Sequence, residues 1–247
     1  MDAIRNYAVT IAYDGTNYSG WQIQANADSV QQRIKDALQK ILRHEVTLTG
    51  AGRTDTGVHA LGQTANFKTE KELDAFQFLY SLNSMLPYDI AVRDLREVPL
   101  SFDARHSAVR RSYIYVISRL KDPFRYKYSH YLYNPPSASE LNALTDVLIR
   151  NNDFASFTKN AEKQQHTLCN LYSASWRSHR DFLVFTITGN RFLHGMVRTI
   201  VGTLLRTAEE GGNENDIQNI LDKRDRTAAG EAVPAKGLFL RKVHYGK

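Results

Sequence analysis

Cysteine is nearly absent from this chain: among its 247 residues only Cys169 carries a thiol. A single thiol excludes an internal disulfide and a cysteine-rich metal site, and its apolar neighbours predict a small buried hydrophobic residue. No run of about 18 apolar residues is present, so no transmembrane helix is expected. The first residues also lack the apolar core of a secretion signal. These absences together predict a cytoplasmic protein.

Several familiar cofactor and catalytic motifs are missing as well. The sequence contains no G-x-x-x-x-G-K-[ST] phosphate loop, no H-E-x-x-H zinc motif, no C-x-x-C pair and no G-x-S-x-G nucleophile turn. Gly50-Ala51-Gly52 begins like a dinucleotide-binding fingerprint, but Asp55 stands where the third glycine belongs. We therefore expect a protein that uses neither a cofactor nor a metal ion.

The charge balance is basic, with 32 Lys and Arg residues against 26 acidic residues and a formal net charge of +6. A positive balance favours a polyanionic partner, although a basic enzyme unrelated to nucleic acid has the same composition. The chain also holds 13 tyrosines and 11 phenylalanines. Aromatic rings stack on unpaired or flipped bases, which tilts the composition modestly toward RNA.

The first half of the chain alternates strand and helix patterns in a β-α-β-β-α-β order. Alternation and helical periodicity predict strands at 7–13, near 46–48, near 65–67 and at 90–98, and helices at 30–42 and 73–85. Ser29 is the expected N-cap of the first helix, with Gln32 reaching back in a capping box. Pro87 is expected to end the second helix, whose apolar positions include Phe76 and Met85.

The second half repeats this rhythm and places α+β as the fold class. The predicted elements are a strand at 111–118, a long loop at 119–138, a helix at 141–148 after Ser139, a hairpin at 172–176 and 182–188, helices at 196–208 and 217–221, and a strand at 238–243. We expect an N-terminal α+β half at 1–106 and a C-terminal α+β half at 107–247, without a flexible linker between them.

The most informative stretch is the loop from Gly50 to His59, GAGRTDTGVH. Polar, glycine-rich loops between strands are where folds present reactive side chains to a ligand. Asp55 is the only acid in this loop and Arg53 precedes it by two residues, as suits a carboxylate kept ionised or used as a nucleophile. A structural turn without chemistry, or a metal site formed by Asp55 and His59, is the alternative interpretation.

This loop and five further motifs carry a resemblance to a known family. Gly50-Ala51-Gly52-Arg53-Thr54-Asp55-Thr56-Gly57-Val58-His59-Ala60 resembles the signature of tRNA pseudouridine synthases of the TruA type. The other motifs follow in the family's order: YDGTNYSGWQ at 13–22, FDAR at 102–105, RSYIY at 111–115, FLHGMVR at 192–198 and GLFL at 237–240. Two positions depart from the family pattern, Asn152 where a histidine is expected and Gly195 where a larger residue is usual.

The resemblance implies a pseudouridine synthase fold, with two RRM/ferredoxin-like halves and a largely antiparallel sheet flanked by helices. It implies isomerisation of uridine to pseudouridine at positions 38–40 of the tRNA anticodon stem-loop, without a cofactor. Asp55 is then the nucleophile and Arg198 the cation paired with it, in a cleft that the C-terminal half completes. The resemblance also implies that Tyr113 stacks on the target base and helps to remove the C5 proton, and that Leu238 forms an apolar wall of the pocket.

The resemblance implies a role for Arg53 and an oligomeric state, and two alternative functions are open for the chain. The resemblance implies that Arg53 fills the space left by a flipped uridine, and that the protein is a homodimer whose partner is tRNA. The first rival is a non-catalytic RNA-binding module with RRM-like halves. The second is a metal-dependent hydrolase that uses Asp55 and His59.

Overall fold

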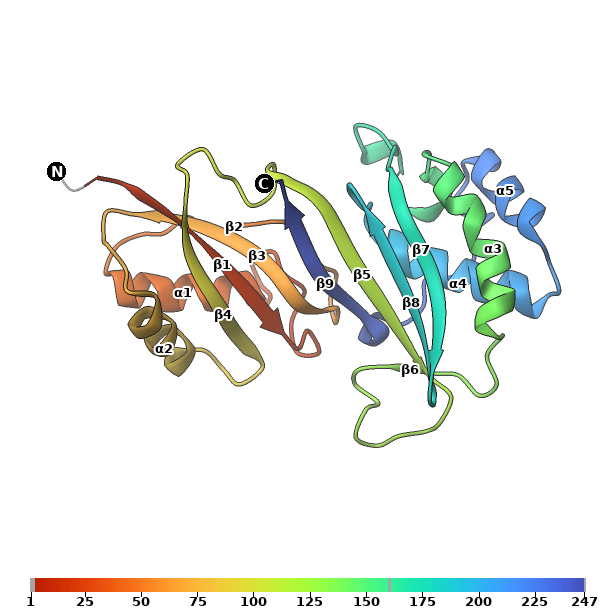
Figure 1. Cartoon of the computed structure of the whole chain (residues 1–247), viewed down its shortest axis with the longest axis horizontal. Coiled ribbons are helices and arrows are strands. Elements are labelled where there is room, and N and C mark those ends of the chain that lie inside the picture. Colours follow the sequence, from red (N-terminus) through yellow and green to blue (C-terminus); the bar gives the residue numbers. More distant parts are fainter. Residues whose placement is uncertain (1–2, 160, 247) are drawn as a thin grey trace. The chain divides into compact units, whose positions relative to one another are not determined.

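The structure is a computed structural model that describes residues 3–159 and 161–246. Its contacts divide the chain into two compact units (Figure 1). Unit 1 runs to Val109 and also contains the residues from Leu240 onward, whereas unit 2 is Arg110–Phe239. The last strand therefore begins in unit 2 and supplies most of its residues to unit 1.

Unit 1 contains the expected β-α-β-β-α-β order. Its elements are β1 (Arg5–Tyr13), α1 (Val30–Leu42), β2 (Thr49–Gly50), β3 (His59–Thr69), α2 (Ala75–Met85) and β4 (Ile90–Val98). β1 pairs antiparallel with β3 on one side and with β4 on the other. β9 (Leu238–Tyr245) is the neighbour of β3, which gives the strand order β4-β1-β3-β9 in this unit.

The core of unit 1 forms where the sheet meets its helices. β1 pairs with a strand on each of its edges, and it is buried along nearly its whole length. The ring of Phe67 on β3 stacks between Tyr7 of β1 at 5.9 Å and Phe78 of α2 at 6.0 Å, measured between ring centroids. Burying such rings is a large apolar contribution to stability, and it fixes α2 over the sheet.

Several local predictions for unit 1 are wrong. Val46 and Leu48 are buried, but the strand there is reduced to Thr49–Gly50. Ser29 does cap α1, whereas the Gln32 side chain donates to Asp36 one turn ahead and does not return to the cap. On α2 the buried residues are Phe78 and Leu82, and the predicted apolar positions Phe76 and Met85 are exposed.

Unit 2 combines three antiparallel strands, a short parallel strand and helices. Its elements are β5 (Ala108–Ser118), β6 (His130–Tyr131), α3 (Ala138–Arg150), β7 (Leu171–His179), β8 (Phe182–Gly189), α4 (Met196–Glu209) and α5 (Glu214–Lys223). The first two residues of β5 belong to unit 1. Short 3-10 helices lie at Ala155–Phe157, Ala161–Lys163 and Ala235–Gly237. The strand order is β5-β8-β7, and β6 pairs parallel with the end of β5. α3 packs against β7, α4 and α5 (Figure 1).

Polar groups fasten α3 to its surroundings. The helix begins after Ser137, two residues before the predicted start, and Ser137 and Glu140 form a capping box. The side-chain amide of Asn142 donates to the carbonyl of Trp176 and accepts from its N–H, at 3.0 and 2.8 Å. Because β7 ends the strand order of unit 2, this pair satisfies backbone groups that an edge strand leaves open.

The fold class predicted from the sequence is confirmed as α+β, with a mostly antiparallel sheet flanked by helices. Cys169 is also buried as predicted, with 1% of its surface exposed, and burial raises the pKa of its thiol to about 11. No helix among residues 3–159 and 161–246 combines the length and apolar character that crossing a membrane requires.

Candidate active site

Asp55 lies in unit 1, in the loop between β2 and β3. The loop leaves β2 with the N–H of Ala51 bonded to the Thr64 carbonyl at 2.8 Å, and the Gln63 amide donates to the carbonyl of Gly52 at 2.9 Å. The carbonyl of Asp55 accepts from the N–H of Val58 at 3.1 Å, which closes a turn around the carboxylate. Asp55 is half-buried and Arg53 is exposed. The loop thus holds its carboxylate partly withdrawn from water.

The segment after β1 holds this loop on both sides of Asp55. The Tyr13 hydroxyl and the Thr54 hydroxyl are 2.8 Å apart in a buried hydrogen bond. The N–H of Trp21 donates to the Thr54 carbonyl at 3.2 Å, and the N–H of Gly57 donates to the Tyr18 carbonyl at 3.3 Å. Residues 13–22 therefore form a clamp on the loop, and they restrict its backbone immediately before and after Asp55.

Gly20 is the point where this clamp comes closest to the loop. Its φ of +87° lies in the left-handed region that side chains rarely adopt. A Cβ at this position would be 2.2 Å from the carbonyl oxygen of Thr54 and 3.1 Å from the carbonyl carbon of Asp55. Only glycine permits both the turn and the contact, so Gly20 belongs to the support of Asp55.

His59 is buried at the start of β3, with 1% of its surface exposed. Its Nδ1 accepts from the N–H of Gly15 at 3.0 Å and lies 3.1 Å from a carboxylate oxygen of Asp14. The imidazole thus joins the turn after β1 to the strand that follows the loop. Within the part of the chain that the structure describes, no three His, Cys, Asp or Glu side chains gather as metal ligands would.

Tyr113 lies in unit 2, half-buried in the middle of β5. Its ring meets Phe192 edge-on, with centroids 5.1 Å apart and planes at 79°. Edge-to-face contacts of this kind fix the orientation of both rings. The sequence motif FLHGMVR contains Phe192, but its role beside Tyr113 was not predicted, because residues 113 and 192 are distant in the chain.

Arg198 is half-buried on the first turn of α4. Its Nε donates to the carbonyl of Val233 at 2.7 Å, and its own carbonyl accepts from the N–H of Val233 at 3.2 Å. These two bonds set the direction in which the guanidinium leaves the helix. Gly195, which departs from the family pattern, is the N-cap of α4 with φ of +70°, and this left-handed conformation explains glycine there.

Tyr115 connects Arg198 and Leu238 within unit 2. It is fully buried, its hydroxyl donates to the carbonyl of Pro234 at 2.9 Å, and its ring packs on Gly237 immediately before Leu238. Burial raises the pKa of Tyr115, and the nearby positive charge of Arg198 opposes that rise. Tyr113 and Tyr115 share one face of β5, since they are two residues apart on a strand. Tyr115, which sequence reasoning missed, thus lies near the charge of Arg198 and packs on Gly237, the residue before Leu238.

The predicted site residues thus form two groups. Arg53 and Asp55 belong to unit 1, and Tyr113, Arg198 and Leu238 belong to unit 2. Leu238 is buried with 5% of its surface exposed, and its role as an apolar wall stays a prediction. The pairing of Arg198 with Asp55 stays a prediction.

Comparisons with known proteins agree on one family. A family model described as tRNA pseudouridine synthase matches residues 9–107 and 148–246. A protein named tRNA pseudouridine synthase A from Thermoanaerobacter sp. is 40% identical over 98% of this chain and 100% of its own length. Its namesake from Caldicellulosiruptor saccharolyticus is 41% identical over the same shares, and that from Bacteroides fragilis is 38% identical over 98% and 97%. The family model covers parts of both units and includes Arg53, Asp55, Arg198 and Leu238, whereas Tyr113 lies between its two matched ranges.

Proposed function

Because this chain belongs to the tRNA pseudouridine synthase family, we propose that it converts uridine to pseudouridine at positions 38–40 of the tRNA anticodon stem-loop. The observation that carries the proposal is the loop of Asp55, whose backbone the clamp at residues 13–22 holds on both sides. A preorganised carboxylate of this kind is suited to meet a sugar carbon with oxocarbenium character.

The reaction is an isomerisation and it balances without a further reactant. The bond from uracil N1 to ribose C1′ breaks, the base turns, and a bond from C5 to C1′ forms. C5 then loses its proton and N1 gains one, so neither electrons nor water are consumed overall. We propose that the Asp55 carboxylate acts at C1′, either by direct attack or by assisting a glycal route, and that no cofactor takes part.

Arg198 and Tyr113 are proposed to complete the chemistry. A guanidinium can hold a carboxylate in a charge-assisted contact and so fix its position. The bonds of Arg198 to Val233 support this role because they hold the guanidinium in one direction. Tyr113 is proposed to stack on the target base, supported by its fixed ring and half-buried position, and Leu238 to form the apolar wall.

Arg53 is proposed to act on the RNA outside the chemical step. A uridine within a stem must leave the helix to be reached, at a cost of a few kcal/mol. Arg53 is exposed on the same loop as Asp55, and its planar guanidinium can both stack and neutralise phosphate. We propose that it occupies the space that the flipped uridine leaves.

We also propose a homodimer and a cytoplasmic location. The location follows from the substrate, since tRNA is processed where it is made and used. The dimer is supported by α2, where Phe76 and Tyr80 are 80% and 72% exposed beside a groove of about 520 Å³. Exposed rings beside a groove are typical of protein interfaces.

The decisive experiment measures tritium released from C5-labelled uridine in unmodified tRNA, without added metal and with a chelator present. The wild-type chain is expected to release tritium and Asp55→Asn to release none. Asp146→Asn, which changes an exposed carboxylate on α3, is the matched control and should retain full activity. Activity retained by Asp55→Asn would remove the nucleophile assignment, and wild-type protein that binds tRNA without release would favour the RNA-binding module.

The same assay separates the proposed roles of the two arginines. Arg198→Met should lower turnover by about a hundredfold or more while tRNA affinity changes little, because a charge at the reacting group is lost. Equal losses in turnover and affinity would contradict the pairing role. Arg53→Ala should reduce base flipping, followed with 2-aminopurine next to the target uridine, and unchanged flipping would refute its role.

A further inference from the structure

Residues 119–133 of unit 2 form an exposed loop with an unusual composition, here called the aromatic loop. Five aromatic side chains lie within it: Phe124, Tyr126, Tyr128, Tyr131 and Tyr133. All five are exposed, Phe124 by 89%, Tyr133 by 85% and Tyr126 by 57%. Soluble proteins rarely leave so many rings of neighbouring residues open to water, and such surfaces mark interaction sites.

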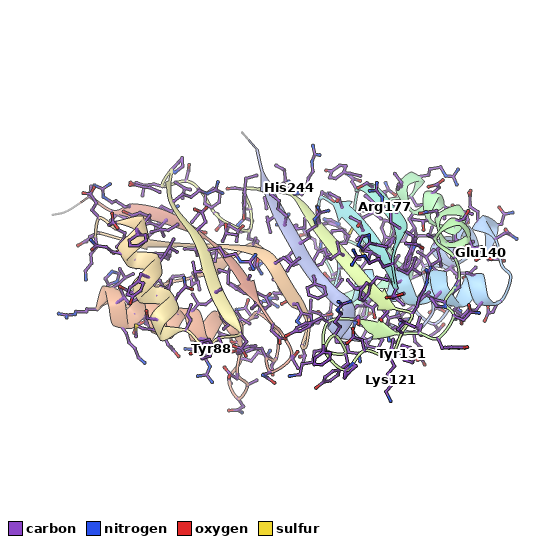
Figure 2. All side chains as sticks on the ribbon, turned by 60° about the horizontal axis from the view of Figure 1, so that its bottom comes forward. Tyr88, Lys121, Tyr131, Glu140, Arg177 and His244 are labelled. Atoms are coloured by element: carbon purple, nitrogen blue, oxygen red, sulfur yellow. The ribbon has the colours of Figure 1, made fainter. Side chains whose placement is uncertain are left out.

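The charge of the aromatic loop is strongly positive. Four cations, Arg119, Lys121, Arg125 and Lys127, face one acid, Asp122. Asp122 serves the loop itself, since its carboxylate accepts from the N–H of Phe124 at 2.8 Å and lies 3.5 Å from Nε of Arg125. Figure 2 shows Lys121 and Tyr131 at one edge of unit 2.

Backbone hydrogen bonds anchor both ends of the aromatic loop. The N–H of Arg119 donates to the carbonyl of Asp181 at 2.8 Å, and the N–H of Leu132 donates to that of Ser118 at 3.0 Å. β6 adds a parallel pairing with the end of β5. The Arg125 guanidinium also lies over the ring of Phe182 at 5.2 Å. A loop ordered before binding loses little conformational entropy when a ligand arrives.

We propose that the aromatic loop is a binding surface for unpaired nucleotides of the RNA substrate, a contact distinct from the residues around Asp55, Tyr113 and Arg198. Rings stack on bases of any sequence, and neighbouring cations neutralise the phosphates between them. Four of the five rings are tyrosines, and Leu120 and Pro123 are the exposed aliphatic residues of the loop, which favours RNA over a lipid surface. The proposal rests on the function proposed above for its choice of tRNA.

The test compares ring removal with ring retention in the full-length chain. Phe124→Ala with Tyr126→Ala should weaken binding of unmodified tRNA and of a 12-nucleotide single-stranded RNA by about tenfold or more, from loss of base stacking. Phe124→Tyr with Tyr126→Phe keeps both rings and should retain affinity. Tyr88→Ala, at a fully exposed tyrosine of unit 1, is the matched control and should change nothing.

Charge removal gives a second and independent readout. Lys121→Gln with Lys127→Gln should lower the slope of log affinity against log salt by about 1.4 to 1.8, because two phosphate contacts are lost. The ring variant should leave that slope unchanged. A 12-base-pair RNA duplex should bind the ring variants with the same affinity as the wild type, since its bases are already stacked on one another.

Three outcomes would overturn the proposal. They are unchanged tRNA affinity in the ring variant, equal losses for duplex and single strand, or loop-dependent binding to anionic lipid vesicles with none to RNA. Normal tritium release together with unchanged affinity would refute this surface alone and leave the proposed function standing. Lost affinity in a chain whose wild type releases no tritium would refute the proposed reaction and leave the RNA surface standing.

Discussion

Asp55 is supported by residues that lie more than thirty positions earlier in the chain. Tyr13 and Trp21 bond to Thr54, and Tyr18 bonds to Gly57, so the carboxylate has its neighbours fixed on both sides. Catalysis by a positioned group depends on such support, because a displacement of about 1 Å can cost two orders of magnitude in rate. The motif at 13–22 is therefore a positioning element for the loop.

Gly20 provides a sharp test of that support. Gly20→Ala places a methyl group 2.2 Å from the Thr54 carbonyl on a backbone with φ of +87°. We expect a loss of about 2 to 4 kcal/mol in the free energy of unfolding, followed by urea titration, and a fall in tritium release. Gly52→Ala is the matched control in the same loop, where an added Cβ meets nothing within 4 Å.

The two substitutions separate the effect of the close contact at Gly20 from the effect of replacing a glycine as such. Gly52→Ala should change the free energy of unfolding by less than about 1 kcal/mol, since its backbone needs no left-handed turn. Equal destabilisation by both alanines would show that the approach at Gly20 does not matter. A stable Gly20→Ala chain with full activity would remove the clamp as a positioning element.

At the level of elements, periodicity predicted most of the fold and missed what depends on tertiary contacts. The order of helices and strands in unit 1 and the β7–β8 hairpin follow from local patterns. The strand predicted at 46–48 is wrong because the apolar residues there are buried without pairing to another strand. Pairing with β3 is limited to Thr49 and Gly50. For α2 the helix was predicted correctly but its buried face was not, because Phe76 is apolar and yet exposed. A sequence does not show which of its apolar residues remain at the surface.

The site divides in the same way. Asp55 and Arg53 stand out because one short loop concentrates their chemistry, and the resemblance supplied Tyr113, Arg198 and Leu238. Tyr115 and the contact of Phe192 with Tyr113 were missed, because each joins segments more than 75 residues apart. Chain-local patterns identify reactive groups, whereas the groups that hold them become visible only in the fold.

β6 carries a titratable group that links the aromatic loop to the pH of the solution. Burial lowers the pKa of His130, and the charge of Lys236 lowers it further. The unfolded chain then binds a proton more readily than the folded chain at pH values below about 6.5. This contribution to stability is full above that pH and is lost as the pH falls toward the folded pKa.

His130→Asn should therefore flatten the decline in stability between pH 7 and pH 5. One proton accounts for at most about 1.4 kcal/mol per pH unit, which sets the limit on the difference in slope. The measurement is the free energy of unfolding by urea at several pH values. His179→Asn, at an exposed position on β7, is the matched control and should leave the slope unchanged. Parallel curves for wild type and His130→Asn would contradict the prediction.

For the whole molecule, the proposed dimer requires a surface patch that can bind a second copy of itself. A two-fold interface joins the same patch on both subunits, so the patch must complement itself. The α2 surface, defined by Phe76, Tyr80 and the groove they line with Asn83 and Arg93, is the patch that we propose for this interface. β4 is the edge strand of unit 1. Its exposed residues Arg93, Asp94 and Arg96 alternate in charge, so the β4 strand of a second copy, running antiparallel, can place opposite charges next to each other.

Phe76→Glu with Tyr80→Glu should convert the dimer to a monomer. Light scattering on the eluting protein should give twice the chain mass of 28.1 kDa for the wild type and a single chain mass for the variant at micromolar concentration. Burying two carboxylates in place of two rings should weaken association by about a hundredfold or more. Phe124→Glu with Tyr126→Glu puts the same charges on equally exposed rings of unit 2 and should remain dimeric. A monomeric wild type would refute the dimer, and a dimeric α2 variant would move the interface elsewhere.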